Sequence, residues 1–164
     1  MTSMCIAAAN YLINRTNNYN RQQTLYKDRI SMSCKRLQKL LYFSDVIYMR
    51  GNNGDSMFTD DFYAWPSGPV IPSVYDTFVQ YQNGEMVPLN EEGHSELNNE
   101  MITALDFVFN NTIKTDTADL VEMSHIPGGP WASVYNENDA EHLQIISKTF
   151  MYQFYLSRNI FTVA

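Results

Sequence analysis

The chain has 164 residues, a formal net charge of -7 and a sequence pI near 4.8. Its composition, with 45% hydrophobic and 18% charged residues, is typical of a globular protein, and its length predicts one domain spanning residues 1–164. Strong non-specific binding to nucleic acid is disfavoured by the acidic balance, and no run approaches the ~18 apolar residues of a membrane span, so we expect a cytoplasmic protein without membrane contact.

The first third of the sequence predicts two helices separated by a polar connection. A short helix is expected over residues 4–15, followed by an Asn-rich loop at about 16–32. Ser33 is the expected N-cap of a helix at about 34–50, in which apolar residues recur at spacings of three and four from Leu37 onward.

The middle of the sequence predicts a small β element and then another helix. Residues 57–65 are rich in aromatic β-formers and favour an extended segment or hairpin. The segment Met86–Leu89 is a candidate partner strand. Because proline is tolerated in a first helical turn, Pro69 and Pro72 indicate a helix that begins near them and ends at about Gln82.

The last third predicts three further helices, at 95–111, at 116–125 and from Asn138 to about Arg158, where Asn138 and Glu141 have the spacing of a capping box. The expected fold is therefore mainly α: a compact multi-helix domain with a small antiparallel β-hairpin element.

Charge is distributed unevenly along the chain. Residues 1–50 hold eight basic and two acidic side chains, a net charge of +6, whereas residues 51–164 carry a net charge of -13. Either the two parts neutralise each other on packing, or one of them is a surface for an oppositely charged partner or for DNA phosphate. The basic residues that start the helix at 34–50 lie off its apolar stripe, so we expect them to be exposed. The side chains that we expect to bind a partner are Lys35, Arg36, Lys39, Glu91, Glu92 and Glu96.

The sequence shows no arrangement typical of catalysis. The sequence contains no glycine-rich phosphate-binding motif. It also contains no cysteine pair with the spacing of zinc ligands. Glu122 and His125 have the i, i+3 spacing of helical di-metal sites, but such sites need two such pairs. Cys5 and Cys34 are expected to be free buried thiols, and Asp60–Asp61 a solvated pair beside a turn. We expect no enzyme activity, no metal site and no cofactor.

Five segments carry a resemblance to a known family. In order, they are Leu37–Phe43, Phe62–Trp65, Gly68–Tyr75, Leu120–His125 and Gly129–Trp131. Together they resemble the motifs of the Panacea domain family, which includes SocA-like antitoxins and GepA-like phage-associated proteins. The residues that match these motifs, and that we expect to hold the fold rather than contact a partner, are Leu37, Lys39, Leu40, Tyr42, Trp65, Gly68, Pro69, Tyr75, His125, Pro130 and Trp131. Both tryptophans are expected to be buried.

The resemblance implies an antitoxin-like function. A member of this family is expected to bind and neutralise a cognate protein toxin, and SocA-like members also deliver the toxin to a protease. The alternative is a regulatory protein of a phage or mobile element that contacts nucleic acid. The polar insert at 16–30 is longer than the family's usual link, and Pro66 follows Trp65 where the family often has a charged or aromatic residue.

Overall fold

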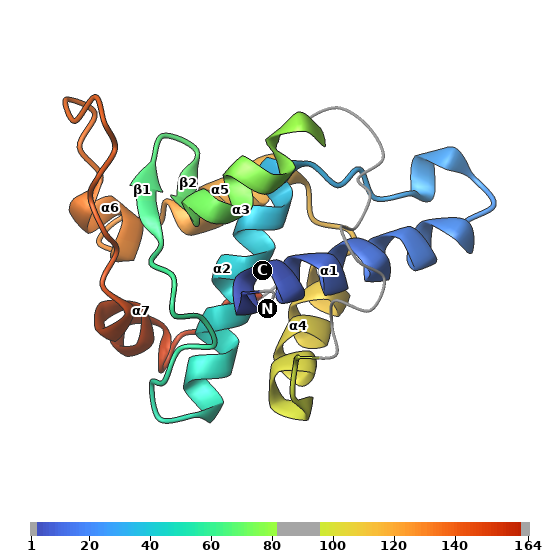
Figure 1. Ribbon diagram of the computed structural model, residues 1–164, viewed down its shortest axis with the longest axis horizontal. Helices are drawn as coiled ribbons and strands as arrows, with labels where there is room; N and C mark the ends of the chain where they lie inside the picture. Colours follow the sequence, from blue (N-terminus) through green and yellow to red (C-terminus); the bar gives the residue numbers. More distant parts are fainter. Residues whose placement is uncertain (1–2, 82–95, 162–164) are drawn as a thin grey trace.

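The computed structural model describes residues 3–81 and 96–161 of the chain. In these residues the fold is mainly helical with one small antiparallel hairpin, as the sequence predicts. A central helix, α2 (Cys34–Gly51), is surrounded by the other elements and packs against most of them (Figure 1). Its neighbours are α1 (Met4–Arg21), β2 (Gly68–Val70), α3 (Pro72–Phe78), α4 (Asn99–Thr112), α5 (Thr117–Ser124) and α7 (Lys148–Tyr155).

Helix α2 begins where the sequence predicts. The Ser33 hydroxyl accepts a hydrogen bond from the Arg36 backbone N–H, which caps the helix. Because neighbours cover the helix on all sides, almost all of its first three turns are buried. The expectation that Lys35, Arg36 and Lys39 form an exposed basic face is therefore wrong for two of the three. Lys35 is exposed, whereas Arg36 and Lys39 are 4% and 0% exposed.

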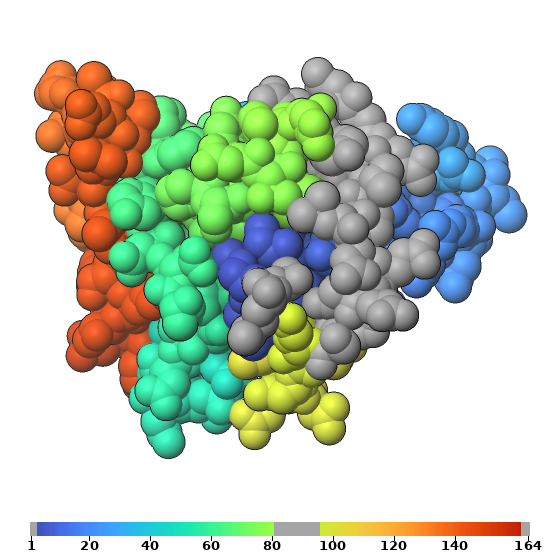
Figure 2. Space-filling model, viewed as in Figure 1, coloured from blue at the N-terminus to red at the C-terminus, as the bar shows by residue number. Residues whose placement is uncertain are grey.

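Helix α1 continues six residues beyond its predicted end at residue 15 and stops at Arg21. The connection to α2 is therefore shorter than the predicted loop at about 16–32, and it contains a 3-10 turn, η1 (Tyr26–Asp28). The Asn20 side chain bonds both the backbone N–H and the carbonyl of Ile30, which ties this connection to the end of α1. The connection projects from the body of the molecule, at the right of Figures 1 and 2.

The hairpin pairs β1 (Tyr63–Trp65) with β2 through a tight turn, with Trp65 opposite Gly68. Gly68 has a φ of 115°, and a Cβ there would lie 2.6 Å from both the Lys39 Cε and the Ser124 Oγ atoms. Glycine is thus required by both the backbone angle and the close approach of α2 and α5. The predicted partner strand Met86–Leu89 lies outside the described residues.

Two helices of the described fold begin at a proline. Helix α3 begins at Pro72, within the range predicted for its start, and a 3-10 turn, η2 (Val79–Tyr81), follows it. The short α6 (Pro130–Val134), which the sequence did not predict as a helix, has Pro130 in its first turn and packs against α7.

The predicted helix from Asn138 to about Arg158 is wrong at its start. Helix α7 covers only Lys148–Tyr155, and its cap is Ser147, whose hydroxyl accepts from the Phe150 N–H. Before it, residues 144–146 lie alongside β1: the Ala64 N–H donates to Gln144 and the Ile146 N–H donates to Phe62. These long-range backbone bonds satisfy the free edge of β1, and they replace the local capping that Asn138 and Glu141 suggested.

Candidate functional site

The residues that carry the family motifs meet where α2 contacts the hairpin. The Gln38 amide makes two hydrogen bonds to the backbone of Ile71, donating to its carbonyl (3.0 Å) and accepting from its N–H (2.9 Å). The Lys39 Nζ atom donates to the Pro69 carbonyl at 3.0 Å. Two consecutive side chains of α2 therefore satisfy backbone groups at the end of β2 and the start of α3, and they fix the hairpin to the central helix.

Arg36 makes a similar attachment on another side of α2. Its Nη1 and Nη2 atoms donate to the carbonyls of Thr115 (2.7 Å) and Thr112 (2.8 Å), at and just beyond the end of α4. The last carbonyls of a helix have no partner within the helix, so this guanidinium acts as a cap supplied by another element. Burial lowers the pKa of Arg36, and the Asp116 carboxylate opposes that change.

Lys39 has a buried amine with a strongly altered pKa. Its burial lowers the pKa from 10.5 to about 7; the nearby Cys34 opposes the shift and the positive charge of Lys35 adds to it. Cys34 is itself buried, and burial raises the pKa of its thiol to about 11. The thiolate form of Cys34 is thus disfavoured near neutral pH.

A stack of three aromatic rings lies behind the hairpin. The ring centroids of His125 and Trp131 are 3.6 Å apart and the two rings are nearly parallel. On the same indole, the ring centroid of Tyr135 is 4.4 Å from that of Trp131. The Trp131 Nε1 atom donates to the carbonyl of Trp65 at 2.8 Å, which ties α6 to β1. Burial lowers the pKa of His125, and the charge of Lys39 acts in the same direction. A neutral imidazole is thereby favoured beside the indole.

The two tryptophans differ in exposure. Trp131 is buried at 9% exposure, as expected, but Trp65 is only half-buried. The Trp65 indole meets the half-buried ring of Tyr75 edge-on at 5.0 Å. These two aromatic side chains form one wall of a groove rather than part of the core.

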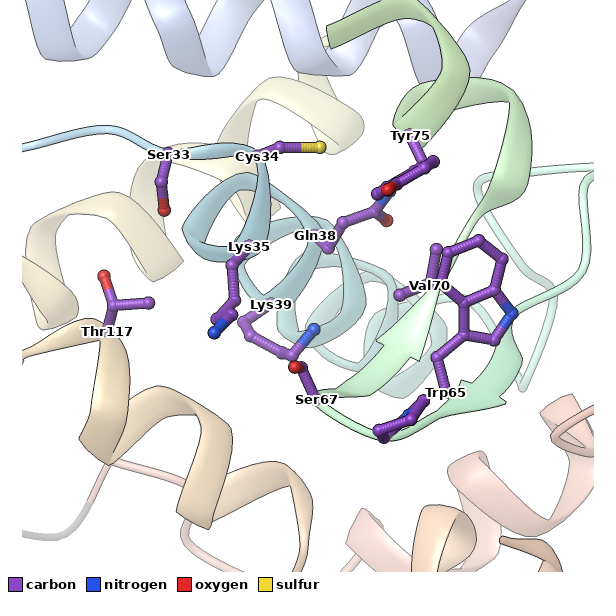
Figure 3. A pocket seen from close by; sticks show the side chains of 11 residues that line it. Ser33, Cys34, Lys35, Gln38, Lys39, Trp65, Ser67, Val70, Tyr75 and Thr117 are labelled. Atoms are coloured by element: carbon purple, nitrogen blue, oxygen red, sulfur yellow. The ribbon is translucent and has the colours of Figure 1, made fainter. Parts of the chain in front are cut away.

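The groove lies between the start of α2, the hairpin and α3, and has a volume of about 490 Å³. Figure 3 shows Trp65, Val70 and Tyr75 on one side of it, and Lys35, Lys39 and Thr117 on the other. The remaining lining residues are Ser33, Cys34, Gln38, Pro66 and Ser67. The groove therefore combines an aromatic wall with a wall that carries amines and hydroxyls.

Other motif residues lie inside the fold. Leu37, Leu40 and Tyr42 are buried on α2, and the Tyr42 ring makes edge-on contacts with Phe43, Phe62 and Tyr155. Pro69 in β2 and Pro130 in α6 are buried as well. Of the residues expected to bind a partner, Lys35 and Glu96 are exposed, while Glu91 and Glu92 lie outside the described residues.

The candidate reactive residues do not converge on one centre. Cys5 donates from its Sγ atom to an oxygen of Asp60 at 3.3 Å, and burial raises the pKa of this thiol. Asp60 also accepts from Ser73 and is half-buried, so it is not the solvated carboxylate that we expected. Glu122 is exposed near the ring of His125. Within residues 3–81 and 96–161, no three His, Cys, Asp or Glu side chains gather in a way that would hold a metal ion.

Sequence reasoning missed Gln38, Tyr135 and the capping role of Arg36. For Gln38 a signal was available, because an amide inside a buried helical motif must find partners for both its oxygen and its nitrogen. Arg36 had no such signal, since its two acceptors lie on a segment that is 76 and 79 residues away in the chain.

Comparison with known proteins gives one match. The family model described as antitoxin SocA-like, Panacea domain, matches residues 37–132, which is more than half of the chain and runs from α2 into α6. No curated protein and no solved structure matches the chain. None of the helices in the described part of the chain has the length and apolar character that crossing a membrane requires.

Proposed function

The chain belongs to the antitoxin SocA-like, Panacea domain family, and we propose that it binds and neutralises a protein toxin encoded beside it. The observation that carries this proposal is the family match, together with the hydrogen bonds that the matched residues make within the chain. Gln38, Lys39 and Trp131 direct their polar groups to backbone carbonyls and N–H groups of the same chain.

A motif whose polar groups are satisfied internally builds a scaffold. Recognition of a partner then depends on side chains that the scaffold holds at the surface, and rigid support for such side chains favours specific binding. The half-buried Trp65 and Tyr75 and the exposed Lys35 are placed in this way, next to Gln38 and Lys39. Tryptophan and tyrosine are enriched among the residues that dominate binding energy at interfaces.

The experiment is co-expression of the chain with the protein encoded by the adjacent reading frame. Expression of that neighbour alone should stop bacterial growth, and co-expression with this chain should restore growth and yield a complex that co-purifies. A neighbour that is not toxic, or a toxic neighbour that neither forms a complex nor loses toxicity, would contradict the proposal.

The same strains test a role as adaptor for proteolysis. If the chain delivers the toxin to a protease, the half-life of the toxin after translation is stopped should shorten when the chain is present and should recover in protease-deficient cells. Neutralisation with an unchanged half-life would limit the chain to inhibition by binding.

Nucleic-acid contact is a second candidate, supported by one cluster of basic side chains. Lys27, Arg29 and Lys114 line a second cavity of about 720 Å³ near the start of α5, together with the buried Arg36 and with the acidic Asp28 and Asp116. In a gel-shift assay at low salt, Lys27→Glu combined with Arg29→Glu should abolish DNA retention if this cluster contacts phosphate. Absence of any retention by the wild-type chain removes this candidate.

A further inference from the structure

We propose that the groove between α2, the hairpin and α3 binds an extended segment of the partner toxin in which an acidic residue lies next to an aromatic or aliphatic residue. This inference rests on the proposed function, because it names the surface and the chemistry by which the toxin would be recognised. It follows from the two unlike walls of the groove and from the charges around it.

One wall of the groove favours a carboxylate. The exposed Lys35 and the buried Lys39 are four residues apart on α2, so they lie on neighbouring turns of one helix face. Burial is the main cause of the lowered pKa of Lys39, and the charge of Lys35 adds to it, so a second positive charge is disfavoured here. None of the described residues that line the groove is acidic. An anion beside Lys35 would offset its charge and favour protonation of Lys39.

The first turns of two helices reach the same wall. Ser33 and Cys34 cap and begin α2, and Thr117 begins α5; all three line the groove. Backbone N–H groups in the first turn of a helix favour negative charge nearby, which adds to the effect of the lysines. Among the described residues, the Lys39 Nζ atom has one hydrogen-bond acceptor, the Pro69 carbonyl, although an ammonium can donate three hydrogen bonds.

The opposite wall favours an apolar side chain. Trp65 and Tyr75 are both half-buried and meet edge-on, with Val70 and Pro66 beside them. Figure 3 shows the Trp65 indole across the groove from the two lysines. A segment that places a carboxylate against Lys35 and an adjacent apolar side chain against Trp65 would therefore satisfy both walls.

Recognition by side chains is favoured over addition of a strand. The Pro69 carbonyl and both backbone groups of Ile71 are already bonded to Lys39 and Gln38. These bonds leave little of the backbone near β2 free to pair with an incoming strand. The specificity of the groove then depends on which side chains the partner presents.

A polyanion fits the groove less well than a single carboxylate. Asp76 on α3 and Asp116 before α5 are exposed, and they are next in the sequence to Tyr75 and Thr117, which line the groove. These two carboxylates would repel the successive phosphates of a nucleic acid. A short acidic-apolar segment presents one charge to the exposed Lys35 and meets less of this repulsion.

The first test uses two peptides that differ only in charge. The probe acetyl-Glu-Phe-Leu-amide is compared with the neutral acetyl-Gln-Phe-Leu-amide while the indole N–H signals of the ¹⁵N-labelled protein are recorded by NMR. The acidic peptide should shift the Trp65 signal in a saturable manner, with an affinity at least tenfold above that of the neutral peptide. Equal affinity for the two peptides, no saturable shift, or a larger response to a single-stranded oligonucleotide would overturn the inference.

The second test uses variants of the full chain. Lys35→Glu reverses the exposed amine, and the new carboxylate lies in the first turn of α2, where the helix dipole favours it, so the fold should be retained. Lys27→Glu makes the same charge change on the projecting connection and is the matched control. Lys35→Glu should weaken binding of both the acidic peptide and the toxin at least tenfold, whereas Lys27→Glu should weaken neither.

The outcomes separate the two proposals. If the wild-type chain neutralises its toxin and Lys35→Glu binds the toxin equally well, the groove inference fails and the proposed function stands. If the neighbour is not a toxin but the acidic peptide binds the groove and loses binding on Lys35→Glu, the proposed function fails and the groove remains a site for acidic-apolar segments.

Discussion

The start of α2 and the connection that precedes it contain the same kinds of residue in opposite surroundings. Arg36 and Lys39 are buried in α2, where each donates hydrogen bonds to backbone carbonyls of distant segments. Lys27 and Arg29 lie exposed on the projecting connection, where the Arg29 guanidinium is 5.7 Å from the ring of Tyr26. A local excess of basic residues therefore does not locate a basic surface, because some of those cations attach one element to another.

The largest expected difference is between a buried aromatic side chain of the folded body and an exposed one on the connection. Trp131→Ala removes a buried ring, two stacking contacts and the hydrogen bond to the Trp65 carbonyl, and should lower the free energy of unfolding by about 3–5 kcal/mol. Tyr26→Ala, at a side chain 85% exposed on the connection, should change it by no more than about 0.5 kcal/mol. Chemical denaturation measures both.

Trp65→Ala provides an intermediate case for the same experiment. Because the indole is half-buried and its hydrogen bond to Trp131 uses a backbone carbonyl, we expect a loss of about 1–2 kcal/mol. A cost equal to that of Trp131→Ala would mean that Trp65 belongs to the core and not to a groove wall.

The two arginines allow a comparison of identical side chains. Arg36→Ala leaves the carbonyls of Thr112 and Thr115 without their charged donor, and should destabilise the fold by about 2–4 kcal/mol. Arg29→Ala should stay within about 0.5 kcal/mol. Similar unfolding midpoints for the two variants would show that the Arg36 cap contributes little to the attachment of α4.

The last comparison depends on pH and concerns Lys39. Because burial lowers its pKa from 10.5 to about 7, folding favours the neutral amine. The stability that the neutral Lys39 amine contributes is fully present above pH 10.5 and is lost as the pH falls toward 7. Lys39→Met removes this dependence. Relative to the wild type, the variant should therefore gain about 2 kcal/mol between about pH 9.5 and about pH 7.5.

Unfolding curves of the two proteins across that range provide the measurement. The chosen pH range lies above the pKa of Asp45, which burial raises to about 6. Titration of that carboxyl therefore contributes little to the change in stability within the range. Lysine-to-methionine keeps the length of the side chain, which limits changes in packing. A stability difference between variant and wild type that does not change with pH would contradict a lowered pKa for Lys39.

Local sequence signals predicted several elements correctly. Each of these signals depends on a few consecutive residues: the Ser33 cap, the apolar spacing of α2 and the proline in the first turn of α3. The failures have a shared cause. The Asn138–Glu141 signal did not start a helix because residues 144–146 pair with β1, and the exposed face expected at Arg36 and Lys39 is covered by elements that follow in the sequence.

The sequence by itself determined the mainly helical fold, the presence of a small β element and the family, because these depend on periodicity, capping and ordered motifs, whereas the pairing of β1 with β2 was not predicted. Only the tertiary structure decided which cations are buried and where the groove lies. Arg36, Gln38 and Lys39 acquire their roles from carbonyls and N–H groups that are 30 or more residues away. Burial and hydrogen bonding depend on such distant neighbours, and residue type alone does not specify them.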